Sequence, residues 1–203
     1  MIIIENLCKT FENKIVFNNF NLTIKNGEFV IFSGDSGCGK TTLLNMIGAI
    51  EPFDSGQILV DGIDISKKKN HISYFQKKIG FLFQNFALVD HKTVRQNLML
   101  VKKNSRSSIS IEEALAEVGL SDKLDQKVYS LSGGEQQRVA LARLMIKQCD
   151  IVLADEPTGS LDRKNSLHVI DILKKMNVSG KTIVLVTHDE ELKQFGQKVV
   201  KLS

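Results

Sequence analysis

Residues 34–41 constrain this sequence more than any other stretch. They read Gly-Asp-Ser-Gly-Cys-Gly-Lys-Thr, which fits the pattern G-x-x-x-x-G-K-[ST], and they lie between an apolar run at 29–33 and a helical pattern from Lys40. In that setting the glycines let backbone N–H groups turn inward around phosphate oxygens, and the helix N-terminus adds its positive end. The alternative is a glycine-rich turn without a ligand, which the flanking strand and helix disfavour. We expect phosphate contacts from Gly34, Asp35, Ser36, Gly37, Cys38, Gly39, Lys40, Thr41 and Thr42.

Two carboxylates follow a second apolar run. Residues 151–154 are apolar, and Asp155 and Glu156 come directly after them. In an open α/β sheet the ligand lies outside the carboxyl ends of the strands, so these carboxylates would meet the phosphate loop. We expect Lys40 to reach the outer phosphates, and Thr41 and Asp155 to bind Mg²⁺. Glu156 would orient or deprotonate the attacking water, although a surface carboxylate on a turn is the alternative.

The pattern along the chain predicts an α/β fold. Short β-rich runs alternate with helical patterns, which is typical of a mostly parallel sheet, and the runs at 2–4 and 22–24 predict antiparallel strands at the N-terminus. The stretch from 86 to 130 differs, because it has helical spacing at 112–118 and a polar, serine-rich segment at 102–110. We therefore predict one domain, 1–203, with a P-loop NTPase core that includes an N-terminal β subdomain (about 1–85 and 131–203) and a helical insert subdomain (about 86–130).

Composition excludes several classes of protein. Hydrophobic residues make up 42% and charged residues 25%, the balance of a soluble globular protein. The net charge is +4, and the basic run at 67–69 has no interleaved aromatics, so we expect a solvated face there and no nucleic acid partner. Three cysteines without a C-x-x-C pair favour reduced thiols in the cytosol. The apolar runs are far shorter than the roughly 20 residues of a membrane-spanning helix, so a transport role would need a membrane partner.

A second glycine-rich turn distinguishes this chain from other P-loop proteins. Leu-Ser-Gly-Gly-Glu at 131–135 is followed by Gln136, Gln137 and Arg138. A serine hydroxyl and two glycine amides at the start of a helix form a second anion site, although a plain serine-capped helix is the alternative. Because the turn lies between the phosphate loop and Asp155, it resembles the signature motif of ABC ATPases.

Other short motifs of the same family follow in its usual order. The resemblance implies that Gln84 contacts Mg²⁺ or water and faces the transport partner, and that His188 contacts the γ-phosphate. Ser160-Leu161-Asp162 resembles the D-loop. Phe11 lies where the family stacks an aromatic ring on adenine, although a core position is the alternative for it. Outside the phosphate loop, the resemblance adds as site residues Phe11, Gln84, Ser132, Gly133, Gly134, Glu135, Asp162 and His188.

Nearly the whole chain takes part in this resemblance, which implies an assembly. Each ATP would lie between Lys40 of one subunit and the 132–134 turn of a second copy, in a head-to-tail dimer with two sites. Closure on ATP and opening after hydrolysis would drive a separate integral membrane permease. The implied location is cytoplasmic, peripheral on the inner face of the cell membrane.

A finer resemblance is to one branch of the family, which serves macrolide exporters, lipoprotein release and bacteriocin or peptide export. Phe-Gln-Asn-Phe at 83–86, the 155–162 segment and the early start of the motifs resemble that branch. It implies export of a peptide, lipid-linked or drug-like substrate. The chain departs from the branch at 144–148, and because it ends at Ser203, soon after the last predicted strand, we expect no regulatory C-terminal domain.

Two other functions stay open. A non-transport ABC ATPase acting on the ribosome or DNA usually has two motif sets or a long coiled coil, whereas this chain has one set and no heptad run between Lys40 and Ser132. A P-loop kinase would not explain the 132–135 turn or His188. If a permease is the partner, we expect its docking surface within the helical insert. Candidates are Val94, Leu98 and Leu100, each of which has a core position as its alternative.

Overall fold

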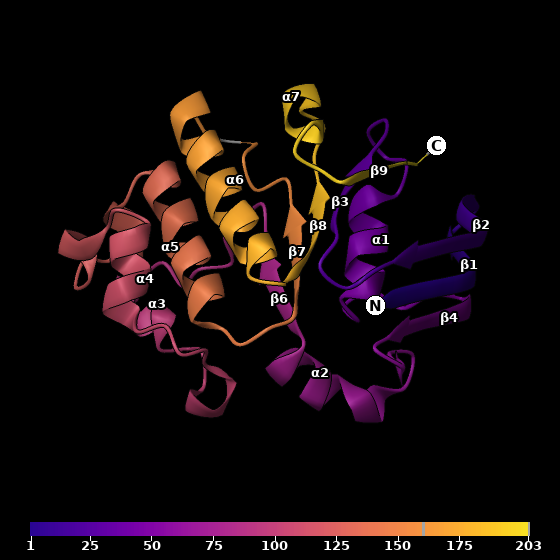
Figure 1. Cartoon of the computed structure of the whole chain (residues 1–203), viewed down its shortest axis with the longest axis horizontal. Helices are drawn as coiled ribbons and strands as arrows, with labels where there is room; N and C mark the ends of the chain where they lie inside the picture. The colour runs from indigo at the N-terminus through magenta and orange to yellow at the C-terminus, as the bar shows by residue number, and fades with distance from the viewer. Residues whose placement is uncertain (160, 203) are drawn as a thin grey trace.

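The computed structural model of the chain describes residues 1–159 and 161–202. Its central element is a five-stranded sheet in the order β6-β7-β8-β3-β9, in which every neighbouring pair is parallel (Figure 1). This confirms the mostly parallel sheet expected from the alternating pattern. The strands are β3 (Phe29–Ser33), β6 (Ile79–Leu82), β7 (Ile151–Asp155), β8 (Thr182–Val186) and β9 (Lys198–Lys201).

A second, antiparallel sheet is built from the N-terminal region, as predicted. Its order is β2-β1-β4-β5, with β1 (Ile2–Phe11), β2 (Lys14–Ile24), β4 (Ser55–Val60) and β5 (Ile63–Asp64). The first two strands are much longer than the predicted runs at 2–4 and 22–24. The reason is that exposed polar residues such as Glu5 interrupt the apolar pattern on the solvent face, and register shifts interrupt the pairing.

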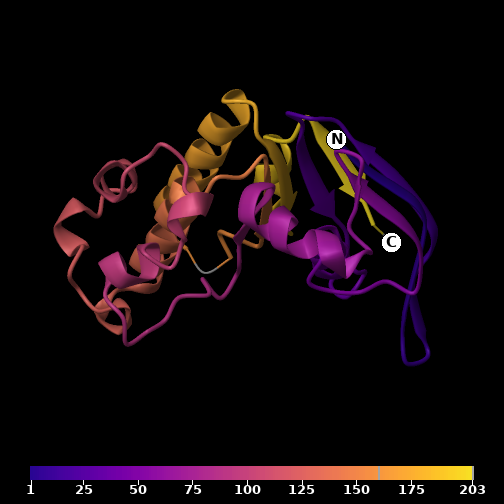
Figure 2. The same ribbon diagram turned by 90° about the horizontal axis from the view of Figure 1, so that it is seen from below.

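Helix α1 (Lys40–Ile47) lies between the two sheets, and α5 and α6 cover the opposite face of the parallel sheet (Figures 1 and 2). Alternate residues of each central strand therefore enter different cores. On β3, Val30 and Phe32 pack in the cluster around α1. Phe29 and Ile31 pack in the cluster beneath the helices. Burial on both faces explains the continuous apolar runs that identified these strands.

The helical side consists of α3 (Val94–Leu98), α4 (Ile111–Glu117), α5 (Gly133–Ile146) and α6 (Arg163–Val178). The predicted helix at 112–118 is confirmed within one residue. Val94 and Leu98 are fully buried in this core, so they cannot form a docking surface, whereas Leu100 is 48% exposed. Helix α5 packs against both α3 and α4.

Two short helices, α2 (His71–Lys77) and α7 (Glu190–Lys193), were not expected from the sequence. Each is too short to show a full apolar period. In the part of the chain that the structure describes, no helix is long and apolar enough to span a membrane.

The strand directions determine where the motifs meet. Strands β3, β6, β7 and β8 are parallel neighbours in one sheet, so their carboxyl ends lie along one edge. Helices α5 and α6 also begin at this edge (Figure 1). One end of the molecule therefore holds the phosphate loop, Asp155 at the end of β7, Glu156 after it, His188 after β8 and the signature turn.

Candidate nucleotide-binding site

The loop from β3 to α1 requires glycine for reasons internal to the fold. Gly39 is the N-cap of α1 with φ 100°, a left-handed conformation that other residues rarely adopt. A Cβ atom there would lie 2.5 Å from Val16 Cγ1, so a side chain cannot be accommodated without movement. No side chain caps the helix, which leaves its first amide groups free to meet a ligand.

Lys40 is the buried cation of this loop. It is 9% exposed, and its Nζ donates hydrogen bonds to the carbonyl oxygens of Gly34 and Asp35, each at 2.8 Å. Among residues 1–159 and 161–202, no carboxylate lies within ion-pair distance of Nζ. Backbone carbonyls do not neutralise the ammonium, so its charge is available to an anion.

A hydroxyl and a carboxylate meet across the loop. The Oγ1 atom of Thr41 donates a hydrogen bond of 2.9 Å to Oδ1 of Asp155. Burial raises the pKa of the Asp155 carboxyl, and the hydrogen bond from Thr41 opposes that shift in part. Two hard oxygen ligands this close, one of them a partly buried carboxylate, fit the donor set that Mg²⁺ prefers.

Glu156 is held in an unusual conformation beside the loop. Its φ is 44°, which is strained for a residue other than glycine, and its N–H donates to the carbonyl of Val186 at 3.0 Å. The Oε2 atom lies 2.9 Å from Nδ1 of His188. That contact lacks hydrogen-bond geometry, so within the described residues Oε2 is buried without a hydrogen-bond partner. A buried, unsatisfied carboxylate oxygen is suited to accept a proton or a hydrogen bond from water.

Lys40, Thr41 and Glu156 line one cavity of about 310 Å³, whereas Asp155 and His188 lie beside it and do not line it. Phe11 contributes to its wall and is 43% exposed, which excludes the core position considered for it. The Nζ atom of Lys9 lies 4.4 Å from the Phe11 ring centroid, so a cation packs against the Phe11 ring. The cavity is lined by Phe11, Lys14, Val16, Ser36, Gly37, Gly39, Lys40, Thr41, Thr42, Glu156 and Val186.

Sequence reasoning missed Lys14. Its Nζ donates to the Gly37 carbonyl at 3.0 Å, which places a second ammonium at the loop. The signal was available in principle, because a tight turn after Phe11 pairs Lys14 with Phe11 across the hairpin. The sequence did not reveal how far β1 and β2 extend, so the pairing of Lys14 with Phe11 could not be predicted.

The signature turn is built differently. Ser132 is the N-cap of α5 and forms a capping box with Glu135: the Glu135 N–H donates to Ser132 Oγ at 3.3 Å, and the Ser132 N–H donates to Glu135 Oε2 at 2.8 Å. This hydrogen bond from the Ser132 backbone lowers the pKa of Glu135. The Glu135 carboxylate is thus engaged within the turn, with Lys123 Nζ 3.6 Å away.

The space beside Gly133 is open within the described part of the chain. Gly133 lies in the first turn of α5 and lacks a positive φ. A Cβ atom at this position would meet nothing within 4 Å among the described residues. Glycine disfavours helices, so its presence here indicates that backbone access from outside matters.

Some predicted site residues lie away from the cavity. Gln84 is exposed on the turn after β6 and does not line it. Asp162 is the N-cap of α6. The 132–134 turn also lies outside the cavity, and Ser160 lies outside the described residues. One chain therefore brings together the phosphate loop, Thr41, Asp155, Glu156 and His188, but not the signature turn.

Comparison with known proteins decides the family. The family model described as ABC transporter matches residues 17–159. The chain belongs to the ABC transporter family. Its ATPase assignment follows from that membership together with the cavity described above.

Individual relatives agree with this assignment. A macrolide export ATP-binding/permease protein of Campylobacter jejuni is 39% identical over 209 residues, covering 100% of this chain and 33% of the relative. The chain thus spans about a third of the length of such relatives. The lipoprotein-releasing system ATP-binding protein LolD of Aquifex aeolicus is 37% identical and covers 98% of this chain and 92% of its own length. The solved dimeric, post-hydrolysis structure of the ATP-binding cassette MJ0796 with ADP and Pi matches with a TM-score of 0.88, 35% identity and coverage of 100% of this chain and 94% of the other.

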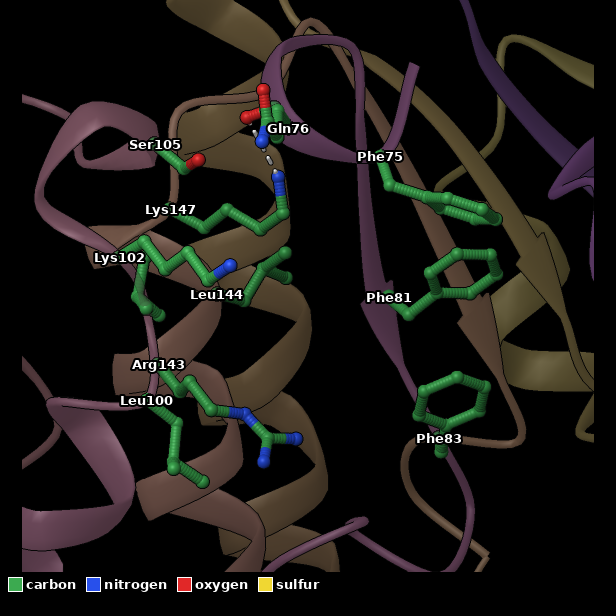
Figure 3. A pocket seen from close by; sticks show the side chains of 11 residues that line it. Phe75, Gln76, Phe81, Phe83, Leu100, Lys102, Ser105, Arg143, Leu144 and Lys147 are labelled. Carbon is green, nitrogen blue, oxygen red and sulfur yellow. Dashed lines mark hydrogen bonds between the residues drawn. The ribbon is translucent and has the colours of Figure 1, made fainter. Parts of the chain in front are cut away.

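This ABC domain has a second cavity, of about 350 Å³, between β6 and the end of α5. Figure 3 shows Phe75, Phe81 and Phe83 on one wall, with Leu100 and Leu144 on the other. The Phe81 and Phe83 rings stack with centroids 5.0 Å apart. Among the described residues, this cavity, called the groove below, is lined by three basic side chains and no acidic one, the basic ones being Lys102, Arg143 and Lys147.

Arg143 joins this groove to the turn that carries Gln84. Its guanidinium donates to the carbonyl of Phe86 at 2.9 Å and to that of Ala87. Burial lowers the pKa of Arg143. The groove therefore contacts the Gln84 turn through Arg143. The signature turn lies at the opposite end of α5.

Proposed function

We propose that this chain is the ATP-binding and ATP-hydrolysing subunit of an ABC transporter whose membrane permease is a separate protein. The observation that carries the proposal is the cluster of Lys40, Thr41, Asp155 and Glu156 at one edge of the sheet. A cation, a hydroxyl, a partly buried carboxylate and an unpaired carboxylate oxygen are what hydrolysis of a nucleoside triphosphate requires.

Each residue has a role in the proposed reaction. Lys40 exchanges its two carbonyl partners for phosphate oxygens, while the adenine stacks on Phe11. Thr41 and Asp155, with Gln84, would hold Mg²⁺, which neutralises phosphate charge when bound. Glu156 accepts a proton from the attacking water while the water oxygen forms a bond to the γ-phosphorus. The bond to the bridging oxygen breaks, releasing ADP and phosphate, and His188 contacts the γ-phosphate.

A second copy of the chain would complete the site. The exposed Ser132 hydroxyl and the accessible backbone at Gly133 form an anion site that no described residue of the same chain fills. Packing of this turn against the nucleotide of another subunit gives two equivalent sites with C₂ symmetry. The solved relative with ADP and Pi is a dimer, which supports this arrangement.

The groove between β6 and α5 is the proposed docking site for the permease. Its aromatic wall and its three unopposed basic residues favour a cytoplasmic segment with apolar and acidic side chains. We propose that the groove lies at the boundary between the core, about 1–85 and 131–203, and the helical subdomain, about 86–130. Docking there would place the chain on the inner face of the cell membrane.

The named relatives support export as the direction of transport. They include a macrolide export protein and a lipoprotein-releasing ATP-binding protein. We therefore propose that the substrate is a peptide, a lipid-linked molecule or a drug-like compound, with bacteriocin export as one form of the first.

A pull-down tests the proposal. Tagged Glu156→Gln, loaded with ATP and Mg²⁺, is recovered from gently solubilised membranes of the source cell. We expect hydrolysis to fall by a factor on the order of 10² to 10⁴, because the general base is lost, and a multi-span membrane protein to be retained in stoichiometric amount. Recovery of ribosomal protein or DNA in its place would overturn the transporter function and leave the ATPase chemistry intact.

Paired groove variants sharpen this test. Leu100→Asp places a carboxylate in the groove and should release the membrane protein without changing ATP binding. The neighbouring Met99 is also exposed but does not line the groove, so Met99→Asp should retain it. Equal retention by both variants would place docking elsewhere.

A further inference from the structure

Asn165, in the first turn of α6, connects the signature helix α5 to Asp162. Its Oδ1 accepts a hydrogen bond from the Arg138 guanidinium of α5. Its Nδ2 donates to Asp162 Oδ2 at 2.6 Å, and its backbone N–H donates to Asp162 Oδ1 at 2.9 Å. The Asn165 side-chain amide thus accepts a hydrogen bond from the signature helix and donates one to the residue that caps α6.

The same side chain faces Gly134 of the signature turn across a gap that would admit a methyl group. A Cβ atom on Gly134 would lie 3.5 Å from Asn165 Nδ2 and 3.7 Å from Leu161 Cδ2, at ordinary van der Waals distance. Asn165 is therefore in position to respond when α5 moves, because Arg138 of that helix donates a hydrogen bond to its amide oxygen.

The described residues on either side of position 160 hold the chain between Glu156 and Asp162 at two points. The Gly159 N–H donates to the Glu156 carbonyl at 3.2 Å, and the Leu161 N–H donates to the Thr158 carbonyl at 3.0 Å. The first end of this segment is fixed by the bond from the Glu156 N–H to Val186. Its last end is fixed by Asn165, whose hydrogen bonds also lower the pKa of Asp162.

A second bond keeps α5 in register with this segment. Gln137 is almost fully buried, and its Nε2 donates to the Pro157 carbonyl at 2.6 Å, one residue after Glu156. The signature helix is therefore tied to both ends of the 156–162 segment. Glu156, with its strained backbone, lies at one of those ends.

We propose that Asn165 is a positioning residue for ATP hydrolysis, which links the signature turn to Asp162 and through that segment to Glu156. The inference rests on the proposed two-subunit site, because it is the nucleotide bound by the other subunit that would press on the turn. Occupancy of the signature turn is then sensed at Glu156 of the same chain, so each site would become active only when the opposite site is closed.

Two substitutions and a matched control test the inference. Asn165→Ala removes the link, and Asn165→Asp keeps the acceptor for Arg138 but loses the donor to Asp162. We expect kcat to fall by about tenfold to hundredfold in both, since a displacement of about 1 Å near the chemistry can have that effect, while KM stays within about twofold. Asn177→Ala is the control, because Asn177 at the far end of α6 donates two comparable bonds, to Gly27 and Lys181. It should lower the melting temperature by a similar amount and leave kcat unchanged.

Dimer formation separates this inference from the function on which it rests. By light scattering with ATP, Glu156→Gln and the double variant Glu156→Gln, Asn165→Ala should both dimerise. If Glu156→Gln alone stays monomeric, the two-subunit site and the inference both fail. If it dimerises while Asn165→Asp hydrolyses ATP at the normal rate, only the inference fails. Loss of the dimer in the double variant, or an equal loss of kcat in Asn177→Ala, would show that Asn165 supports assembly or stability and does not position Glu156.

Discussion

The phosphate loop and the signature turn are built from the same parts, yet they differ in how much of the site their own chain supplies. Both are glycine-containing turns at the N-terminus of a helix. In the phosphate loop Lys40 is buried and Gly39 has a positive φ and no room for a side chain. In the signature turn Ser132 and Gly133 are exposed, and Gly133 has space around it in the described structure. Neighbours in the same chain therefore require glycine in the phosphate loop, whereas the described neighbours do not require it at Gly133.

Helix capping shows the same contrast. Helix α1 has no side-chain cap, so its first amides are left for a ligand, whereas α5 is capped by the Ser132–Glu135 box. The capping box leaves the Gly133 and Gly134 amides without a side-chain partner in the box. An uncapped turn with a buried lysine is suited to bind an anion within one subunit, and a capped, exposed turn fits the proposed approach of a second subunit's nucleotide.

Lys40→Ala should have the largest effect on the phosphate-loop side. It removes the buried cation of the loop, and with it the charge-assisted bonds to the outer phosphates. Each such bond contributes about 1.5–3 kcal/mol, so the Kd for Mg-ATP should rise on the order of 100-fold or more. Isothermal titration of the purified subunit measures this. Affinity within a few-fold of the parent would refute the assignment of the cradle.

Ser132→Arg should distinguish the role of the signature turn from that of the phosphate loop. The nucleotide contacts of its own subunit are untouched, so binding of ATP to one chain should persist. The long side chain obstructs the surface that would meet the other subunit's nucleotide, so ATP-dependent dimers should disappear in the Glu156→Gln background, as measured by light scattering.

Its control exploits a second capping box in the chain. Ser110 caps α4 with Glu113 in the same way that Ser132 caps α5 with Glu135. Ser110→Arg should therefore lose a similar stability, about 0.5–2 kcal/mol, and keep the dimer. A dimer that survives Ser132→Arg would contradict the role of the signature turn.

The sequence predicted the elements that are buried on both faces and the motifs attached to them. The parallel strands have continuous apolar runs, and the phosphate loop has an unambiguous spacing, so β3 and β7 were found within one residue. Strands β1 and β2 were underestimated because their solvent face is polar, and α2 was missed because it spans only seven residues.

What the sequence could not predict is the pairing of side chains across elements. The bond from Thr41 to Asp155 followed from the strand edge, but Lys14 at the phosphate loop depends on hairpin register. Asn165 was not singled out, because its role depends on how α5 packs on α6. Burial decided between core and surface for Val94 and Leu100, which have similar apolar character.

The smallest expected effect, and the sharpest comparison, comes from one methyl group placed in each turn. Gly39→Ala puts a Cβ atom 2.5 Å from Val16 Cγ1 in a left-handed conformation, and should destabilise the fold by about 1–3 kcal/mol. Gly133→Ala meets no described neighbour and reduces the freedom of the unfolded chain, so it should stabilise the fold by about 0.4–1 kcal/mol. Urea unfolding of both variants measures these changes.

Activity should nevertheless fall in both variants, for different reasons. Gly39→Ala should weaken ATP binding to the single subunit, because the loop can no longer keep its shape. Gly133→Ala should leave that affinity unchanged and reduce ATP-dependent dimerisation, because the added methyl group keeps the other subunit's phosphates away from the backbone amides. A variant that gains stability while losing assembly would show that the glycine serves contact with a second molecule. If Gly133→Ala destabilises the chain instead, then the signature turn, like the phosphate loop, is shaped by its own fold, and the contrast between the two turns disappears.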